Sequence, residues 1–221
     1  MTKIHDAIFI ADSHYNSSRT QLENLLQTIK NSDTKNIFLV GDIFDFLSND
    51  ISYFRQKNNK IINIINSLSK QKNIIYLEGN HDFNIKDIFP DCRVVTREQQ
   101  PYMFVLNEKK VALSHGDIFT AILYNIYTKL IRHKYIGKIL NKIDVCGFIS
   151  KIVEQKLKTK KICKEIKDFD TFAKKRLKFY DKYKADIVVE AHYHQGKRYK
   201  NYINLPSFAC SKTYFTQEDM Y

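Results

Sequence analysis

Side chains of the kinds that bind divalent metals recur in five short polar clusters along the chain. Each cluster follows an apolar run that has the composition of a strand. The clusters are Asp12-Ser13-His14, Gly41-Asp42, Gly79-Asn80-His81-Asp82, His115-Gly116-Asp117 and His192-Tyr193-His194. Carboxylates, amide oxygens and imidazoles are the ligands that Mn²⁺, Fe²⁺ and Zn²⁺ accept. Together the clusters predict a hydrolytic site that holds two metal ions.

The spacing within the clusters suits phosphoryl chemistry. A pair of divalent ions about 3.5–4 Å apart clamps a phosphoryl group and lowers the pKa of bound water to about 7. Alternate residues of a strand point the same way, so Asp12 and His14 can reach one ion together. In the third cluster Gly79 permits a tight turn and Asn80 supplies a neutral oxygen. His81 is then left free to act on the substrate.

The clusters follow the strands of a predicted parallel sheet. Three apolar runs rich in Ile, Val, Phe and Tyr alternate with segments of helical period, which is typical of βαβ units. The runs are 5–11, 36–40 and 73–78, and the helical segments are 17–30 and 52–68. In open α/β sheets ligands bind outside the carboxyl ends of the strands, where the first three clusters lie.

A hairpin and a long helical segment separate the later clusters. Residues 101–115 predict a β-hairpin that ends at His115. Apolar residues then recur at every fourth position from Phe119 to Ile143, which indicates an amphipathic helix or helix pair. Gly137 and Gly147 are possible break points, and strand character returns near residue 185. The segment 118–184 is therefore predicted to be a helical insertion between two metal motifs.

The insertion carries the whole excess of positive charge. Residues 118–184 contain 18 Lys or Arg and 6 Asp or Glu, a net charge of +12, and the rest of the chain has 18 of each kind. Such asymmetry favours contact with nucleic acid, an anionic membrane surface or an anionic ligand. A solvated helical face is the alternative.

Composition predicts one soluble domain. The chain has 221 residues, 43% of them hydrophobic, with no run of 18 apolar residues and no leader-like start, so we expect neither a membrane span nor secretion. Four cysteines lie far apart without a CxxC pair, and we expect them to be reduced packing residues. They are Cys92, Cys146, Cys163 and Cys210.

In this order the five clusters resemble the signature of calcineurin-like metallophosphoesterases, D-x-H, G-D, G-N-H-[DE], H and G-H-x-H. The resemblance covers residues 1–117 and 185–210, with Ala191 where the family usually has Gly. It implies an α/β fold, an α/β/β/α sandwich with a helical insertion. We expect residues 1–221 to form a single domain, with a basic lid at about 118–184.

The resemblance also implies a role for each motif residue. Two divalent ions are expected, with Mn²⁺ preferred and Fe²⁺ or Zn²⁺ as alternatives. Asp12, His14 and His194 would hold the first ion, Asn80, His115 and His192 the second, and Asp42 would bridge them. His81 would stabilise the transition state or protonate the leaving oxygen, and Asp82 would orient it.

Within the family, the sequences GDIFDF, GNHDF and SHGD look like UDP-2,3-diacylglucosamine pyrophosphatases of lipid A biosynthesis. Those enzymes release a diacylglucosamine 1-phosphate and UMP, and the proteobacterial form commonly has Arg at the position of His81. An apolar helical row can receive acyl chains, and basic residues can meet the diphosphate. The expected substrate contacts are Asp45, Leu123, Tyr127, Lys129, Ile131 and Arg132.

The expected partners follow from this resemblance. They are an amphipathic lipid-linked UDP-sugar substrate and an anionic membrane surface, and nucleic acid is not expected. The protein would be cytoplasmic and peripheral on the cytoplasmic face of the inner membrane, and its oligomeric state stays open. A phosphodiesterase acting on nucleotides or nucleic acid is the alternative enzyme. A non-catalytic scaffold is disfavoured, because every ligand position is filled. Asp45 could instead support a ligand, and Glu78 is expected on the surface.

Overall fold

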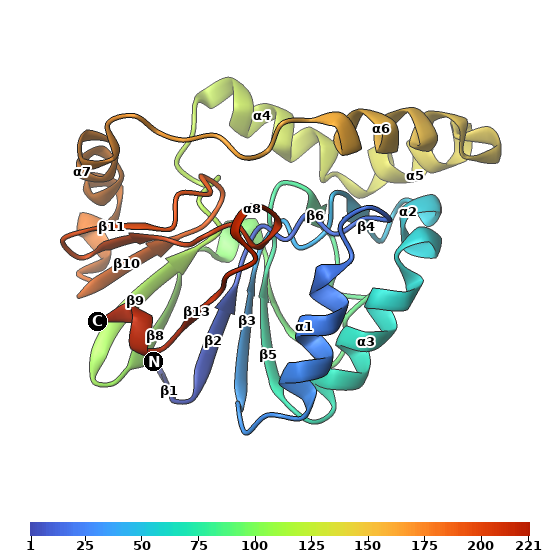
Figure 1. Cartoon of the computed structure of the whole chain (residues 1–221). Coiled ribbons are helices and arrows are strands. Elements are labelled where there is room, and N and C mark those ends of the chain that lie inside the picture. Colours follow the sequence, from blue (N-terminus) through green and yellow to red (C-terminus); the bar gives the residue numbers. More distant parts are fainter.

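Two β-sheets pack face to face in the computed structural model, which describes all residues 1–221 (Figure 1). The five-stranded sheet has the order β13-β2-β3-β5-β7, and the six-stranded sheet has the order β1-β8-β9-β10-β12-β11. The first sheet contains β13 (Phe215–Thr216), β2 (Ala7–Ile10), β3 (Asn36–Val40), β5 (Asn73–Leu77) and β7 (Arg93–Val95). The second contains β1 (Thr2–Ile4), β8 (Tyr102–Leu106), β9 (Lys109–Ser114), β10 (Ile187–Glu190), β12 (Tyr202–Asn204) and β11 (Lys197–Tyr199). A short parallel pair, β4 (Leu47–Ser48) and β6 (Asp82–Phe83), stands apart.

Helices cover the outer faces of both sheets. Helices α1 (Gln21–Lys30) and α3 (Asn59–Ser69) lie side by side on the five-stranded sheet, and α7 (Phe169–Tyr180) covers the six-stranded sheet (Figure 1). The remaining helices are α2 (Ser52–Lys57), α4 (Ile122–Ile131), α5 (Lys134–Ile143), α6 (Phe148–Thr159) and α8 (Phe208–Ser211). Short 3₁₀ turns are η1 (Arg97–Gln99), η2 (Val145–Gly147), η3 (Asp181–Tyr183) and η4 (Glu218–Met220). The predicted α/β/β/α sandwich is confirmed.

The strands are apolar on both faces because both faces are buried. Successive side chains of a strand point to opposite sides of the sheet. In β2, Ile8 and Ile10 face the outer helices, whereas Phe9 faces the second sheet. Phe9 and Phe38 stack with their ring centroids 4.7 Å apart, and Phe38 lies 5.0 Å from Phe104 of the other sheet. This aromatic contact joins the two sheets.

The insertion is smaller than the expected lid. Helices α4, α5 and α6 lie across one end of the molecule, whereas α7 is a layer of the sandwich (Figure 1). The apolar face of α7 packs on the six-stranded sheet in a cluster of Ala112, Phe169, Ala173, Tyr180, Val188 and Tyr202. We therefore use the name lid for residues 122–159 only. None of the helices has the length and apolarity needed to cross a membrane.

The breaks within the lid fall partly where expected. Gly147 has φ +71 and lies directly before α6, so this break is confirmed. The prediction for Gly137 is wrong, because this residue lies inside α5. A Cβ atom there would lie 2.5 Å from the Cβ of Asp50, so glycine allows the helix to approach the body closely. The first break instead lies at Arg132 and His133.

Two of the four cysteines are paired. Cys163 and Cys210 form a disulfide across 47 residues of sequence, so the expectation that all four are reduced is wrong. Cys92 is buried and Cys146 is exposed, and both are free. The disulfide joins the segment between α6 and α7 to helix α8.

Candidate metal centre

The predicted ligands lie in loops that follow the central strands of both sheets. Strands β2, β3 and β5 lead to Asp12, Asp42 and Asn80, and strands β9 and β10 lead to His115 and His192. Parallel pairing of β2 with β3 and β5, and of β9 with β10, brings these loops to one edge. The two packed sheets therefore meet at a single centre.

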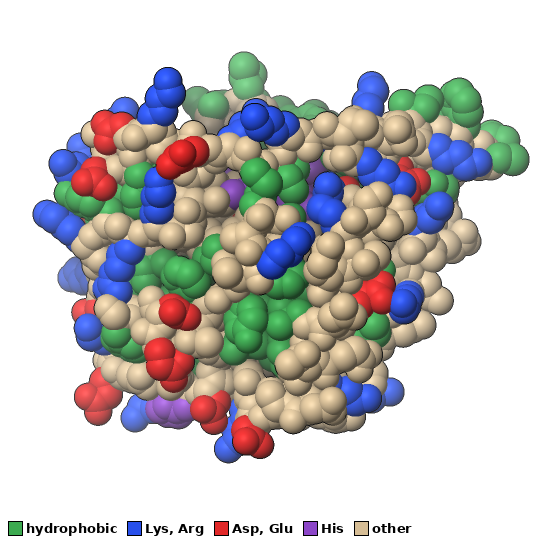
Figure 2. Space-filling view, viewed as in Figure 1, with side chains coloured by type: hydrophobic (Ala, Val, Ile, Leu, Met, Phe, Trp, Pro, Cys, Tyr) green, Lys and Arg blue, Asp and Glu red, His purple; other side chains and the backbone are tan.

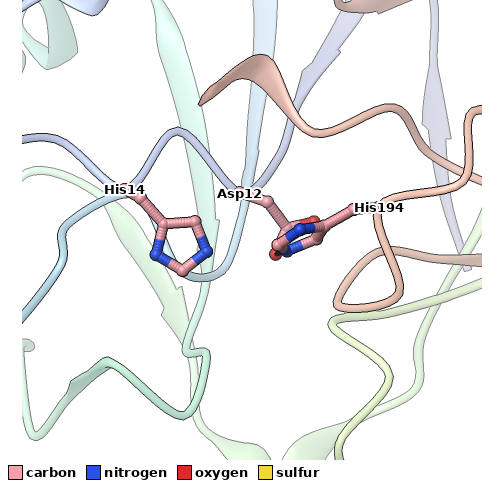
Figure 3. A group of neighbouring side chains, drawn as sticks. All are labelled: Asp12, His14 and His194. Atoms are coloured by element: carbon pink, nitrogen blue, oxygen red, sulfur yellow. Dashed lines mark ion pairs between the residues drawn. The ribbon is translucent and has the colours of Figure 1, made fainter. Parts of the chain in front are cut away.

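The first group of candidate ligands consists of Asp12, His14 and His194. One ligand atom from each lies within 4.8 Å of the others. Asp12 and His194 converge although they come from different sheets, with His194 Nε2 3.2 Å from Asp12 Oδ1 (Figure 3). His194 Nδ1 contacts the backbone carbonyl of Ile162 at 2.9 Å. This contact turns Nε2 of His194 toward the carboxylate.

The second group consists of Asp42, His115 and His192, with Asn80 beside it. His115 Nδ1 contacts the carbonyl of Val40 at 3.1 Å, so Nε2 faces the centre. That Nε2 atom lies 3.2 Å from Asn80 Oδ1, 3.3 Å from His192 Nδ1 and 3.5 Å from Asp42 Oδ1. Several lone pairs thus converge on one point, as they do around a cation.

Asp42 is shared between the groups. It belongs with His115 and His192 and also with His14 and His81, each set having ligand atoms within 4.8 Å of one another. This position between the two groups is the one that a bridging carboxylate needs. Its role as the bridge, like the role of His81, stays a prediction.

In the second group Asp42 and His192 are in the forms that bind a metal, whereas His115 must first release a proton, as metal binding requires. Burial opposes a charge on Asp42, but His115 and His81 outweigh it and hold the pKa of Asp42 well below its usual value. Burial likewise opposes a charge on His115, yet the Asp42 carboxylate raises the pKa of His115. Burial and then His115 lower the pKa of His192 to about 4. Asp42 is therefore an anion and His192 a neutral imidazole, the forms that bind a metal.

Unpartnered atoms in the first group test whether a metal fits. Asp12 Oδ1 and both ring nitrogens of His14 are buried and make no well-aligned hydrogen bond, although His194 Nε2 lies 3.2 Å from Asp12 Oδ1 and the Asp45 carboxylate lies 3.4 Å from His14 Nδ1. Buried polar atoms without partners cost roughly 1–3 kcal/mol each, so native folds rarely keep them. A divalent cation would satisfy Asp12 and His14 together. The buried His and Asp clusters thus suit a dinuclear metal site.

Backbone geometry at the centre is unusual. Asp12, His14, Asp42, His192 and His194 all have φ between +41 and +63, a region that non-glycine residues rarely adopt. Such conformations cost of order 1–3 kcal/mol each and gather at functional sites. These conformations change the direction of the backbone, and so of the side chains, just after each strand ends.

Two glycines allow the loops to approach one another. A Cβ atom on Gly41 would lie 2.4 Å from His115 Nδ1, and one on Gly79 would lie 2.3 Å from Asp42 Oδ1. Both distances are too short for any other residue, so glycine is required in these two motifs. The metal loops are packed as tightly as a protein core.

Comparison with known proteins identifies the family. The family model for calcineurin-like phosphoesterases matches residues 6–196. The chain belongs to the calcineurin-like phosphoesterase family. The predicted resemblance is confirmed at the level of the family.

Curated relatives are distant. The chain is 26% identical over 138 residues to a UDP-2,3-diacylglucosamine hydrolase of Coxiella burnetii. The aligned residues make up 60% of this chain and 56% of the relative. The chain is 26% identical over 114 residues to a protein of that name from Shewanella piezotolerans, covering 50% and 47%. The chain thus spans about half the length of the curated relatives it matches. A protein of unknown function from Aquifex aeolicus aligns over 97% of this chain and 96% of its own, at 12% identity and a TM-score of 0.48.

Asp82 has a different place from the one expected. The ring of His81 contacts the carbonyl of Asp45 at 2.5 Å, so Asp82 does not orient it. The Asp82 carboxylate instead accepts backbone N–H groups of Asp42, Ile43 and Gly79 at 2.7–2.9 Å. Burial and then the Asp42 charge raise the pKa of Asp82 to about 7. Asp82 thus joins the loop after β3 to the loop after β5.

Asp45 lies against the metal centre. Its carboxylate is 3.4 Å from His14 Nδ1 and 2.5 Å from a guanidinium nitrogen of Arg19. Burial raises the pKa of Asp45, but contacts from His14, Asn16 and Arg19 bring it below its usual value. Of the two expected roles, this geometry favours support of His14. Sequence patterns missed Arg19 and Asn16, which belong to no family motif.

The remaining expected substrate contacts divide by position. Tyr127 and Ile131 line a cavity of about 550 Å³ between the lid and the body. Leu123 and Lys129 are exposed on the outer side of α4. Arg132 is buried against Glu78, so Glu78 does not have the surface position that was expected. The substrate contact of Arg132 stays a prediction.

The cavity adjoins the metal centre. Phe46 and Phe83, which directly follow Asp45 and Asp82, form part of its wall. Helix α2 and the lid complete the wall with Ile51, Phe54, Tyr127, Leu130, Ile131, Ile136, Leu140, Asp144, Ile149, Ser150 and Val153. The lining is almost wholly apolar, and it lies next to a centre made almost wholly of charged and polar groups.

Proposed function

We propose that this phosphoesterase cleaves the pyrophosphate of a nucleotide sugar that carries acyl chains, UDP-2,3-diacylglucosamine, to 2,3-diacylglucosamine 1-phosphate and UMP. The observation that supports this proposal is the apolar cavity beside the metal centre. A phosphoesterase for small polar substrates has no use for a wall of phenylalanine, leucine and isoleucine next to its metals. The distant similarity to UDP-2,3-diacylglucosamine hydrolases agrees with the proposal.

Two divalent ions, with Mn²⁺ as our first choice, would occupy the two groups of ligands. Asp12, His14 and His194 would hold one and Asn80, His115 and His192 the other, with Asp42 between them. When bound, such a pair polarises a phosphoryl group and supplies hydroxide at neutral pH. Left-handed backbone at five of the seven ligands, and the close approach of the loops at Gly41 and Gly79, would help to hold the ligands in place.

His81 is the proposed proton donor. Its Nδ1 is held by the Asp45 carbonyl and its backbone N–H donates to Asp42 Oδ1 at 2.8 Å. Both the ring and the backbone of His81 are therefore held, and ring atom Nε2 is left to meet the substrate. A positioned imidazole can protonate the oxygen that leaves as the pyrophosphate breaks, and it would donate here without moving.

The cavity would receive the acyl chains. Its volume of about 550 Å³ lies in the range of small-molecule sites, roughly 300–1,000 Å³. Phe46, Phe54 and Phe83 belong to the body, whereas Leu130, Ile136 and Leu140 belong to the lid. Bound chains would therefore hold the lid against the body. The hydrophobic effect would supply about 0.8 kcal/mol for each buried methylene group.

We further propose that the lid rests on an anionic membrane, at the cytoplasmic face of the inner membrane. An outer apolar surface, which we define as Ile122, Leu123, Ile126, Val145 and Phe148, is turned to solvent. Figure 2 shows apolar side chains along the upper edge of the molecule, over the lid, with basic side chains among them. Ile122 and Leu123 are 77% and 81% exposed. Apolar residues among lysines suit the headgroup region of anionic lipid.

Substrate comparison tests this function. With Mn²⁺ present, the protein should release UMP from UDP-2,3-diacylglucosamine far faster than from UDP-N-acetylglucosamine, which has the same diphosphate and lacks the two long chains. Equal turnover of the two would count against the acyl cavity. A preference for oligonucleotides would support the alternative, a phosphodiesterase acting on nucleic acid, and affinity would then fall steeply with salt.

A further inference from the structure

Arg132 connects the lid directly to a metal loop. It lies at the end of α4, and its side chain is only 7% exposed. Its Nη1 donates to Glu78 Oε2 at 2.8 Å, and its Nη2 donates to the carbonyl of Gly79 at 2.5 Å. The guanidinium also stacks 5.2 Å from the ring centroid of Phe83. A lid residue thus reaches through to the strand end that carries Asn80.

The Gly79 carbonyl belongs to the peptide group that precedes Asn80. The backbone N–H of Gly79 donates to Asp82 Oδ1 at 2.8 Å, so a residue of the body holds this end of Gly79. The carbonyl of Gly79 accepts a hydrogen bond only from Arg132, so a residue of the lid holds the other end of Gly79. Rotation of this peptide would move Asn80, whose Oδ1 lies 3.2 Å from His115 Nε2. The direction of a predicted metal ligand therefore depends on a lid residue.

The backbone of Arg132 is held to the same loop. Its carbonyl accepts a hydrogen bond from Asn84 Nδ2 at 2.7 Å, and Asn84 also contacts Asp50 at 2.9 Å. Leu130 and Ile131, directly before Arg132, line the apolar cavity. The same end of α4 therefore touches both the cavity and the metal loop.

Stability alone does not account for this arginine. Its Nε is buried and has no hydrogen-bond partner, which costs free energy. A buried ion pair is often no more stable than an apolar pair of similar volume. The two terminal nitrogens of the guanidinium donate to Glu78 and to the Gly79 carbonyl at the same time. An apolar residue or a lysine lacks this forked pair of donors.

We propose that Arg132 is a positioning residue that couples the seated lid to the metal-binding geometry of Asn80. The inference rests on the proposed two-metal function. When the lid is seated on the body, as it is here, Arg132 holds the Gly79 peptide and Asn80 points at the second metal position. When the lid lifts, Gly79 loses its donor and Asn80 is released. Full metal binding would then accompany lid closure.

The test separates positioning from simple burial of charge. Arg132→Met alone leaves Glu78 buried and unpaired, so it should unfold more easily. The double variant Arg132→Met with Glu78→Gln removes both charges and should regain most of the melting temperature, while the Gly79 carbonyl still lacks its donor. Titration calorimetry with Mn²⁺ should then show the first equivalent unchanged and the second weakened about 10- to 100-fold. Bis(4-nitrophenyl) phosphate has no acyl chains for the lid to bind, so its turnover reports on the metals. This turnover should fall together with the affinity for the second Mn²⁺ equivalent.

Asn141→Ala is the matched control. Asn141 Oδ1 accepts from the backbone N–H and the hydroxyl of Ser52, both at 2.8 Å, so it ties the lid to helix α2 and contacts no metal loop. This variant should bind both Mn²⁺ equivalents as wild type does. The inference would be overturned if the double variant bound both Mn²⁺ equivalents with wild-type affinity. It would also be overturned if Asn141→Ala weakened the second equivalent as much as the double variant does. A wild-type protein that binds no Mn²⁺ would overturn the proposed function itself.

Discussion

His115 Nε2 lies 3.5 Å from Asp42 Oδ1, although Asp42 follows β3 of one sheet and His115 follows β9 of the other. The contact forms only when the two sheets pack face to face. The aromatic contact between Phe38 and Phe104 joins the two sheets on the same strand, β3, that leads to Asp42. The metal centre is thus a product of the sandwich as a whole.

Removal of the shared carboxylate should empty both metal positions. Asp42→Asn keeps the size of the side chain but removes the charge that faces His115, His81 and His14. We expect neither Mn²⁺ equivalent to bind tightly, and turnover should fall by more than the roughly 10- to 100-fold typical of residues behind a metal ligand. Elemental analysis of the dialysed variant checks this. Two bound equivalents in Asp42→Asn would show that Asp42 is no bridge.

Chelation should destabilise the wild-type protein. A metal that binds only the folded state stabilises it by about 2.7 kcal/mol at a free concentration 100 times the dissociation constant. EDTA should therefore lower the melting temperature, and Mn²⁺ added in excess should restore it. The Asp42→Asn variant serves as the control and should respond to neither. An unchanged melting temperature of the wild type in EDTA would argue against a metal in the folded protein.

Loss of His81 should impair chemistry and leave metal binding intact. Its ring is held by the Asp45 carbonyl, so His81→Ala removes the proposed donor without removing a predicted ligand. We expect kcat to fall about 10²–10⁴-fold, as for a general acid, with both metal equivalents retained. The roles would be reversed if metal were lost while kcat at saturating Mn²⁺ stayed normal.

Filling the cavity should affect only acylated substrates. Ile136 lines the cavity, whereas Ile139 of the same helix is exposed. Ile136→Trp should raise KM for UDP-2,3-diacylglucosamine about tenfold or more, because the indole would occupy the space of acyl methylene groups that each contribute about 0.8 kcal/mol when buried. Ile139→Trp is the matched control and should behave as wild type. Hydrolysis of bis(4-nitrophenyl) phosphate should be normal in both, and a shared loss on the two substrates in a folded Ile136→Trp would contradict an acyl site.

The outer apolar surface should anchor the protein to vesicles. Replacing Ile122 and Leu123 with serine removes two side chains that would leave water on binding, each contributing about 1.5–3 kcal/mol when fully buried. Sedimentation with vesicles of phosphatidylglycerol and phosphatidylethanolamine should show binding weakened at least tenfold. Tyr214→Ser, outside the lid, provides the control. If the Ile122 and Leu123 variant bound as wild type does, this face would not be the membrane contact.

The disulfide should contribute to stability. Cys163 and Cys210 close a loop of 47 residues, for which about 2–4 kcal/mol is typical. Cys163→Ser should therefore lower the free energy of unfolding by that amount, and dithiothreitol should do the same to the wild type. The exposed free thiol offers the control, since Cys146→Ser should change nothing. Equal stability of Cys163→Ser and wild type under oxidising conditions would contradict the bond.

The sequence predicted the centre better than its surroundings. Short motifs at strand ends predicted which side chains converge, because each strand and its polar cluster are adjacent in the chain. The pair of Glu78 and Arg132, 54 residues apart, has no local signal, so the pairing was not predicted and Glu78 was wrongly expected on the surface. The disulfide was missed for the same reason. Helix α7 was assigned to the lid because its apolar face has the same period as a lid helix, and only packing on β10 and β12 distinguishes them.

The most direct test of the central claim is anomalous diffraction at the manganese edge from crystals grown with MnCl₂. Two peaks should lie on opposite sides of Asp42, one among Asp12, His14 and His194 and the other among Asn80, His115 and His192. A single peak, or peaks that do not contact Asp42, would contradict the two-metal centre.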